Sequence, residues 1–411
     1  MAIDVATLRR DFPTLARSID GHRLVYLDSA ASSQTPEPVL DVMDRYYRQS
    51  RSNVHRGVYQ LAEEATDMFE GARTAVARLV DADERGVIFT KNATEACNLV
   101  AYSWVRKKMG PGDVILSTVM EHHANQVPFV YAANDLGIEV RHIPVTDTGE
   151  LDLVAAEELV KDGRVTFAAI THVSNVLGTI NDIPALTQML RKANENVVIH
   201  IDGTQGVPHM AVSFRALDVD FYAFTGHKML GPTGIGVLVG KPERLEAMDP
   251  FLAGGDMIRD VTLTGATWNE LPHKFEAGTP MIAEAAGLGA AATYLATLGL
   301  DAVRRHEQQL TGTFLDALEH VDGVHLFGPK DTSKRSGAIS FKVDGVHPHD
   351  IGAWLGSRGV CVRVGHHCAK PLMRCLDVNA TVRASVYLYN DEDDLEPFIT
   401  GLRDARAFFA R

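Results

Sequence analysis

A lysine stands at the end of a predicted buried strand in the segment DFYAFTGHKMLGPTGIG, residues 220–236. The strand is apolar up to Thr225, and Gly226, His227 and Lys228 follow it before a glycine-rich turn. Burying an ammonium group is costly unless the group is paired or used. The position therefore predicts either a lysine that forms a Schiff base with a carbonyl compound such as pyridoxal phosphate, or a solvated loop lysine.

An aspartate ends a second apolar strand, in VVIHIDGTQG (residues 197–206), and this Asp202 precedes Lys228 by 26 residues. Ligands of open α/β sheets gather at the carboxyl ends of the strands. A carboxylate there can keep a pyridinium nitrogen protonated, so that the ring accepts carbanion electrons. A turn or helix cap is the alternative role for Asp202. The two strand ends together favour a pyridoxal phosphate site.

A helix start after the predicted strand 87–90 offers a place for the phosphate. In KNATE (residues 91–95), the free backbone N–H groups and the helix dipole suit an anion, and the Thr94 hydroxyl adds a donor. Ordinary capping of the helix by Asn92 or Thr94 explains the same residues.

The histidines of MEHH (residues 120–123) follow another predicted strand. An imidazole at this edge of the sheet can stack on a flat ring. Histidine pairs also bind metals, but the sequence contains no H-E-x-x-H motif and no Cys/His cluster at zinc spacing. We therefore expect no metal.

A cysteine lies among basic residues in CVRVGHHCAKP, residues 361–371. Cationic neighbours favour the thiolate of Cys368, and a thiolate is the nucleophile in sulfur chemistry; these neighbours are Arg363, His366, His367 and Lys370. The alternative is a buried, inert thiol. Cys361 is expected in the core, and Cys97 and Cys375 have no special neighbours in the sequence.

Strand and helix patterns alternate through the first two thirds of the chain, which favours βαβ units and a mostly parallel sheet. Strands are predicted at 87–90, 113–118, 138–143, 165–172, 197–202, 220–225 and 234–240, and helices at 95–108, 124–135, 153–161 and 183–194. Later helices are predicted at 300–320, 349–358 and 391–410, with strands at 337–343 and 360–364. We predict an α/β fold whose seven-stranded sheet is flanked by helices (residues 21–298). A smaller α+β domain is expected to combine residues 299–411 with the N-terminal arm, residues 1–20.

The composition restricts the class of protein. Lys and Arg number 40 against 53 Asp and Glu among 411 residues, and the net charge of −13 argues against a nucleic-acid partner. Four cysteines are too few for a disulfide framework, so we expect a reducing, cytoplasmic location. We expect no signal peptide, and the apolar segment 285–300 predicts a buried helix rather than a membrane span.

Stretches along nearly the whole chain resemble the SufS-like cysteine desulfurases, a branch of the pyridoxal-phosphate class V aminotransferase superfamily of fold type I. The matching stretches are YLDSAA (26–31), NVHRGVY (53–59), NATEACN (92–98), MEHHANQVP (120–128), THVSNVLGT (171–179), IDGTQG (201–206), TGHKMLGPTGIG (225–236), FEAGTP (275–280), RVGHHCAKPLM (363–373) and VRASVYLYN (382–390).

This resemblance implies a role for each matching residue. Lys228 is expected to hold the cofactor, Asp202 to pair with its ring nitrogen, His122 to stack on the ring and Gln205 to reach the ring hydroxyl. The phosphate is expected to lie against Ala93, Thr94, Thr225 and His227, with Thr279 reaching the phosphate of a neighbouring subunit in a homodimer. Thr225 replaces the serine usual in the family, and Met281 replaces a common asparagine. Substrate carboxylate binding is expected from Arg383 and Asn175, with Arg363 and His55 close by.

The activity implied is conversion of L-cysteine to L-alanine and a persulfide on Cys368, with Lys228 removing the Cα proton. The sulfur is expected to supply iron–sulfur cluster assembly. The segment DGVHPHD (344–350) resembles relatives that pass sulfur to a SufU-type zinc scaffold, which makes His349, and after it His347, candidate partner-binding residues. Two exposed loop histidines are the simpler explanation.

Three other functions fit parts of the same pattern. One is selenocysteine lyase, in which Cys368 matters less because selenium is a better leaving group. A second is another class V enzyme, either an aminotransferase or a kynureninase-like hydrolase, but neither needs a thiol at Cys368. The third is a non-catalytic scaffold of the sulfur system, for which retention of Lys228 and Asp202 is unexpected.

Overall fold

A seven-stranded sheet organises most of the chain in the computed structural model, which describes residues 3–409. Its strand order is β4-β10-β9-β8-β7-β5-β6, and β10 runs antiparallel to both of its neighbours. The strands are β4 (Val87–Thr90), β5 (Val114–Thr118), β6 (Glu139–Ile143), β7 (Val165–Thr171), β8 (Val198–Asp202), β9 (Phe221–Thr225) and β10 (Gly236–Gly240). All seven predicted strands are confirmed, with ends shifted by at most two residues.

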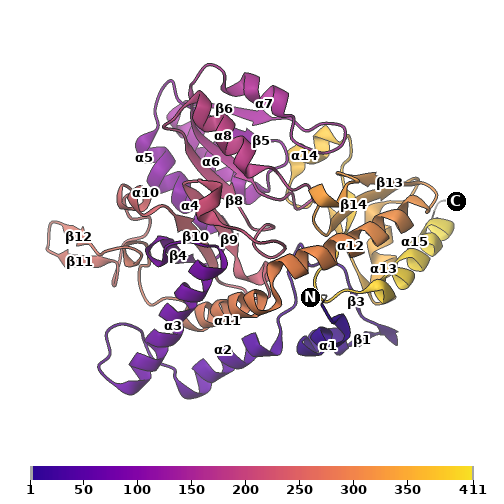
Figure 1. The fold of residues 1–411 in the computed structure, drawn as a ribbon, viewed down its shortest axis with the longest axis horizontal. Helices are drawn as coiled ribbons and strands as arrows, with labels where there is room; N and C mark the ends of the chain where they lie inside the picture. The colour runs from indigo at the N-terminus through magenta and orange to yellow at the C-terminus, as the bar shows by residue number, and fades with distance from the viewer. Residues whose placement is uncertain (1–2, 410–411) are drawn as a thin grey trace.

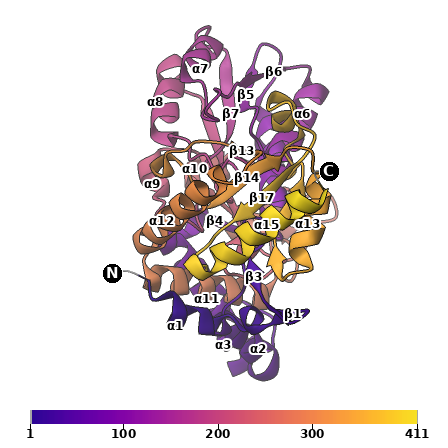
Figure 2. The same cartoon turned by 90° about the vertical axis from the view of Figure 1, so that its right-hand side faces the viewer.

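Helices cover both faces of this sheet because its strands are apolar on both sides. Ile199 and Ile201 of β8 pack into one core and Val198 into the other. Figure 2 shows α8 and α6 on opposite sides of the sheet. The first core also takes side chains of α3 (Gln60–Leu79), α7 (Leu153–Val160), α8 (Ile183–Ala193) and α11 (Ile282–Leu298), and the second takes those of α4 (Ala93–Val100), α6 (His123–Leu136) and α10 (Pro242–Glu246).

The predicted helix 95–108 is divided in the structure. Helix α4 passes into a π-helical turn, Ala101–Val105, and then into the short α5 (Arg106–Lys108). Below the sheet in Figure 1, α2 (Glu37–Gln49) and α3 pack against α11. The predicted buried helix 285–300 is confirmed as α11, which ends at Leu298 because Gly299 has a φ of +82°.

A four-stranded antiparallel sheet lies beside the large one, in the order β13-β14-β17-β16. Its strands are β13 (Val324–Phe327), β14 (Ala338–Val343), β16 (Arg363–Gly365) and β17 (Thr381–Ser385), and its helices are α12 (Leu300–Glu319), α13 (Pro348–Gly356) and α15 (Leu395–Phe409). The predicted strand 360–364 is two strands. β15 (Val360–Cys361) pairs with the N-terminal β3 (Val25–Tyr26), whereas β16 joins this sheet.

The remaining elements are short. They are α1 (Val5–Leu8), α9 (Phe214–Leu217) and α14 (Lys370–Cys375), with the hairpins β1 (Ser18–Ile19) with β2 (His22–Arg23) and β11 (Ile258–Val261) with β12 (Ala266–Trp268). The β11–β12 hairpin projects from the left of the molecule in Figure 1. Among the described residues no single helix is long and apolar enough to cross a membrane; α11 and α12 pass that test only as a pair bent by 75°.

The first residue of β10 packs directly on the start of α4. A Cβ atom on Gly236 would lie 2.4 Å from the carbonyl carbon of Asn92 and 2.8 Å from the nitrogen of Ala93. Both contacts are with backbone, which cannot rotate away. This glycine therefore sets how closely the strand approaches the helix start.

Replacing Gly236 by alanine is expected to lower the free energy of unfolding by about 2 kcal/mol, because the new methyl group forces two backbone segments apart. Gly71→Ala is the matched control, since Gly71 lies exposed in α3 and a Cβ atom there would meet no other atom within 4 Å. This control is expected to stabilise the protein by about 0.5–1 kcal/mol through helix propensity. Urea unfolding of both variants tests the packing, and equal midpoints would contradict it.

Candidate active site

A cavity of about 200 Å³ opens where the carboxyl ends of β7, β8 and β9 meet the four-stranded sheet. It brings together most of the residues singled out from the sequence. Those that line it are Ala93, Thr94, His122, Asn175, Asp202, Gln205, Thr225, His227, Lys228, Arg363 and Arg383.

The lysine and the aspartate reach the cavity from neighbouring parallel strands. β8 ends at Asp202, whose Oδ1 accepts the N–H of Thr204 at 3.0 Å, and β9 leads into the 3₁₀ turn Gly226–Lys228. Burial lowers the pKa of Lys228 to about 8, although Asp202 opposes this shift. Burial also raises the pKa of the Asp202 carboxyl, which Lys228 opposes in turn. The amine is therefore more readily deprotonated than an ordinary lysine.

An anion site lies at the start of α4. The Oδ1 atom of Asn92 accepts the N–H of Glu95 at 2.9 Å, which leaves the N–H groups of Ala93 and Thr94 directed to the cavity. The exposed Thr94 adds a hydroxyl, and His227 also lines the cavity, with its Nδ1 atom 3.3 Å from the hydroxyl of Ser32. These donors fit a phosphate group.

His122 presents a neutral, oriented ring. Its Nδ1 atom accepts the N–H of Ala124 at 3.1 Å and so caps α6. Burial, assisted by the charge of Lys228, lowers the pKa of His122 to about 3. A flat, uncharged imidazole fixed in this way suits stacking on an aromatic ring.

Two arginines on paired strands form the end of the cavity opposite α4. Arg383 of β17 pairs in register with Arg363 of β16. The fully buried Arg383 donates from Nη1 to the Asn175 carbonyl at 2.9 Å and from Nη2 to Asp28 at 3.1 Å, but its buried Nε has no partner. Burial lowers the pKa of Arg383 to about 10. The two cations that line the cavity fit a carboxylate.

Cys368 lies in a groove that adjoins the cavity, with Thr94, His122 and Ala124 lining both. Val127 and Tyr131 of α6 form the outer part of this groove. The backbone at Cys368 is left-handed, with a φ of +56°. Its carbonyl accepts the N–H of His123 at 2.7 Å.

The residue before the cysteine is fixed as well. The carbonyl of His367 accepts from the side chain of Asn175 at 2.8 Å, and its Nε2 lies 2.8 Å from the Thr381 hydroxyl. Burial lowers the pKa of His367 to about 2. The expectation of four cationic neighbours for Cys368 is therefore wrong for His367, which is neutral because it is buried.

Other expected site residues lie outside this cavity. Thr279 lines a separate hollow with Phe89 and Glu276. His347 and His349 are exposed at the start of α13, where Nδ1 of His347 accepts the His349 N–H at 3.3 Å.

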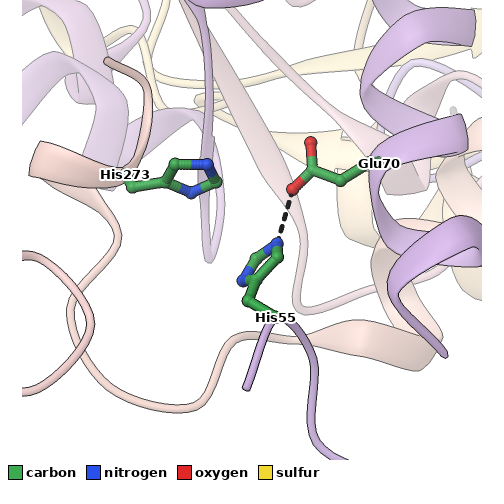
Figure 3. Close-up of side chains that lie close together, drawn as sticks. All are labelled: His55, Glu70 and His273. Atoms are coloured by element: carbon green, nitrogen blue, oxygen red, sulfur yellow. Dashed lines mark hydrogen bonds and ion pairs between the residues drawn. The ribbon is translucent and has the colours of Figure 1, made fainter. Parts of the chain in front are cut away.

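His55 also lies elsewhere, in a cluster with Glu70 and His273 (Figure 3). Its Nε2 is 2.8 Å from Glu70 Oε1, and ligand atoms of all three residues lie within 4.8 Å of one another. Arg73 donates to both oxygens of Glu70, at 2.8 and 3.3 Å. Although burial alone raises it, hydrogen bonds from His55 and Arg73 lower the pKa of Glu70 to about 2. We assign no metal here, because the guanidinium already occupies the carboxylate.

Sequence reasoning missed two polar contacts behind Asp202. Glu121 is buried and accepts from Thr118 and from the Thr171 N–H, and burial raises its pKa to about 8. Cys97, which has no special neighbours in the sequence, has its Sγ 3.5 Å from Nε2 of His200. Cys97 lies in an ordinary helix pattern and Glu121 stands beside the histidines of MEHH, so residue spacing gave no signal for either contact.

Comparisons with known proteins agree with this geometry. The family model for class-V aminotransferases matches residues 25–398. A probable cysteine desulfurase of Halobacterium salinarum is 46% identical over 99% of this chain and 98% of its own length, and one of Halalkalibacterium halodurans is 45% identical over 98% of each.

Solved structures of other proteins match this chain over nearly its whole length. The apo cysteine desulfurase of Thermococcus onnurineus superposes with a TM-score of 0.93 at 38% identity, covering 98% of both chains. The cysteine desulfurase CsdA of Escherichia coli gives 0.91 at 36% identity over the full length of both. The chain therefore belongs to the class-V aminotransferase family.

Proposed function

We propose that this chain is a cysteine desulfurase, which uses pyridoxal 5′-phosphate to convert L-cysteine to L-alanine and keeps the sulfur as a persulfide. The observation that carries the proposal is that the cavity and the adjoining groove have lining residues in common. Thr94, His122 and Ala124 line both the cavity of Lys228 and the groove of Cys368. An amine suited to hold a carbonyl cofactor and a thiol suited to accept sulfur therefore border adjoining hollows.

The cavity residues fit pyridoxal phosphate. Lys228 would hold its aldehyde carbon, Asp202 its ring nitrogen and Gln205 its ring hydroxyl, while His122 stacks on the ring. The phosphate would lie on the Ala93 and Thr94 N–H groups, near the side chains of Thr225 and His227. When bound, the cofactor withdraws electrons from the substrate Cα, which makes its proton removable.

Substrate binding is assigned to the arginine end of the cavity. The guanidinium groups of Arg383 and Arg363, which line the cavity, would hold the cysteine carboxylate. Asn175 supports this end through its own carbonyl, which Arg383 contacts, and its side chain donates to the loop of Cys368. Carboxylate binding and thiol placement are thus joined through one residue.

Proton and sulfur transfer follow from the two reactive groups. Lys228, released as a free amine, would take the Cα proton, which its lowered pKa favours. The Cys368 thiolate would then attack the substrate sulfur: an S–S bond forms, the Cβ–S bond breaks, and its electron pair goes to Cβ, which takes a proton. L-Alanine leaves, and Cys368 carries a persulfide.

We also propose a homodimer. Thr279 and His55 lie outside the cavity of their own subunit, which is the position required if each contributes to a neighbouring subunit's site. In that arrangement Thr279 would reach the neighbour's phosphate and His55 its substrate end.

For the sulfur acceptor we propose a SufU-type zinc scaffold that serves iron–sulfur cluster assembly. His349 is the candidate to exchange with a zinc ligand, with His347 beside it at a ring separation of 5.3 Å. Both rings are exposed at the start of α13. A cytoplasmic location is proposed as well, supported by four cysteines that are all free.

Cys368→Ala is expected to reduce alanine formation from L-cysteine by about a hundredfold or more, because the sulfur then has no acceptor. The visible absorption of the bound cofactor should remain. Cys375→Ala, which alters an exposed cysteine at the end of α14, is the matched control and should keep the wild-type rate. Wild-type alanine formation by Cys368→Ala would show that the nucleophile is another group.

Capture of pyridoxal phosphate by the apoprotein is expected to accelerate about tenfold per pH unit up to pH about 8 and then level off. The neutral amine is the nucleophile, and burial lowers the pKa of Lys228 from 10.5 to about 8, so the amine is neutral above that pH. Stopped-flow absorbance measures the rate, and Lys228→Ala should show no capture. A rate still rising above pH 9 would contradict the lowered pKa.

His349→Ala is expected to weaken binding of a zinc-loaded SufU-type scaffold about tenfold or more, because a ligand for the exchanged zinc is lost. Isothermal titration with the holoenzyme measures the dissociation constant. His320→Ala, at an exposed histidine whose ring bonds the Asp316 carbonyl, serves as the control and should bind as the wild type does. Equal affinities for both variants would remove His349 from the acceptor site.

A further inference from the structure

A buried acid and base lie directly behind Gln205 and take no part in the chemistry described above. The Nε2 atom of His209 is 3.2 Å from Gln205 Oε1, and its Nδ1 atom is 3.0 Å from Oε1 of Glu307. His209 is 5% exposed and Glu307 is fully buried. The three side chains form one line that starts at the cavity and ends in α12.

The hydrogen-bonding chemistry of this line fixes a proton on His209 Nε2. The Gln205 Oε1 atom is a carbonyl oxygen and can only accept, so the imidazole must donate to it. On the other side of the ring, one proton lies between Nδ1 and the Glu307 carboxyl. It is either on Nδ1, which makes the two residues an ion pair, or on the carboxyl, which then donates to Nδ1. His209 carries hydrogen on Nε2 in both cases.

This donor determines which way the Gln205 amide faces. With Oε1 held by His209, the amide nitrogen Nε2 donates one hydrogen to the Ala30 carbonyl at 2.7 Å. Its second hydrogen remains for the cavity that Gln205 lines. Reversal would set two carbonyl oxygens, those of Gln205 and Ala30, against each other.

We propose that His209 and Glu307 are positioning residues, which hold the Gln205 amide so that its N–H faces the ring oxygen of the cofactor. The proposal rests on the placement of pyridoxal phosphate given above. His209 acts on the cofactor only through Gln205, and Glu307 only through His209.

The surroundings of His209 and Glu307 show that burying this pair has an energetic cost. The second carboxyl oxygen of Glu307 is buried without a hydrogen-bond partner, and the ring of Tyr387 packs edge-on against His209 with centroids 4.8 Å apart. A leucine in place of Glu307 would avoid the unpartnered oxygen. The one hydrogen-bonded oxygen of the Glu307 carboxyl contacts His209 Nδ1, which indicates that the carboxyl serves to orient the imidazole.

Sequence position supports the same interpretation. His209 follows Gln205 by four residues in the turn after β8, where the His209 N–H bonds the Gly206 carbonyl at 3.1 Å, so the two side chains lie one above the other. Glu307 comes from the first half of α12, which belongs to the C-terminal part of the chain. The line therefore connects the cofactor cavity to a helix outside the large sheet.

Glu307→Leu is the direct test, with Gln205→Leu as the reference variant. Removing the carboxyl lets the imidazole turn or change tautomer, so the Gln205 amide loses its fixed orientation. We expect Glu307→Leu to shift the visible absorption maximum of the holoenzyme in the same direction as Gln205→Leu. We also expect the dissociation constant of pyridoxal phosphate to rise about tenfold, as for one lost hydrogen bond.

Two further variants separate positioning from mere loss of stability. Glu307→Gln keeps a hydrogen-bonding partner for Nδ1 and should restore the wild-type absorption maximum. Thr311→Val changes another fully buried α12 side chain, whose hydroxyl has no partner, and should leave both readouts unchanged. If Glu307→Leu keeps the wild-type spectrum and affinity while Gln205→Leu changes them, the positioning role is overturned. If Gln205→Leu itself changes neither the absorption maximum nor the dissociation constant, the placement of the cofactor ring beside Gln205 is wrong instead.

A measurement on the unaltered protein covers the case in which Glu307→Leu does not fold. A neutron crystal structure of the deuterated holoenzyme shows which imidazole nitrogens carry deuterium. We expect deuterium on Nε2 of His209, directed at Oε1 of Gln205. A bare Nε2 would overturn the proposal.

Discussion

The site depends on holding a lysine amine and an aspartate carboxyl inside one cavity at a fixed edge of the sheet. Burial disfavours the charged form of each group: it lowers the pKa of Lys228 to about 8 and raises that of Asp202. Each charge partly offsets the penalty on the other. The arrangement persists because β8 and β9 are adjacent and parallel, so both strands deliver their ends to the same place.

The remaining groups are arranged around this pair by the two layers of the fold. The large sheet and its helix α4 supply the anion site, whereas β16 and β17 supply Arg363 and Arg383 from the other side. The cavity is therefore built between two independently packed cores. Asp28, which follows β3, completes the arginine end by pairing with Arg383 at 3.1 Å. Three distant parts of the sequence thus meet at one substrate end.

Local patterns were sufficient for the large sheet and for the residues at its strand ends. Apolar runs that are buried on both faces are easily recognised in a sequence. For that reason the sequence positions of Lys228 and Asp202 were enough to predict that both lie at strand ends bordering one site. The 360–364 strand was harder, because Val362 separates two segments with different partners, and pairing is a long-range property. Strand β17 carries Arg383, but its alternation is short, and only the family resemblance indicated a role for this arginine.

Contacts that run between segments had no sequence signal. Whether His367 is charged depends on its burial beside Thr381, and Cys97 meets His200 of β8 only because helix α4 packs on the nearby strands β9 and β10. The line from Gln205 through His209 to Glu307 joins residues about a hundred positions apart. Residue type and spacing therefore predicted what chemistry is present, while packing decided which groups are neutral, charged or oriented.

The backbone ties around Cys368 have a consequence for how sulfur leaves the protein. The His123 N–H, the Asn175 side chain and the His123 ring each hold a main-chain atom of the segment 367–370, at 2.7, 2.8 and 3.1 Å. Swinging the whole segment outward would break all three bonds. Rotation about the side-chain bonds is the inexpensive motion, so the persulfide travels only a few bond lengths. Delivery must then occur at the groove itself: an accepting atom has to reach Cys368 past Val127 and Tyr131 of α6, which line the groove.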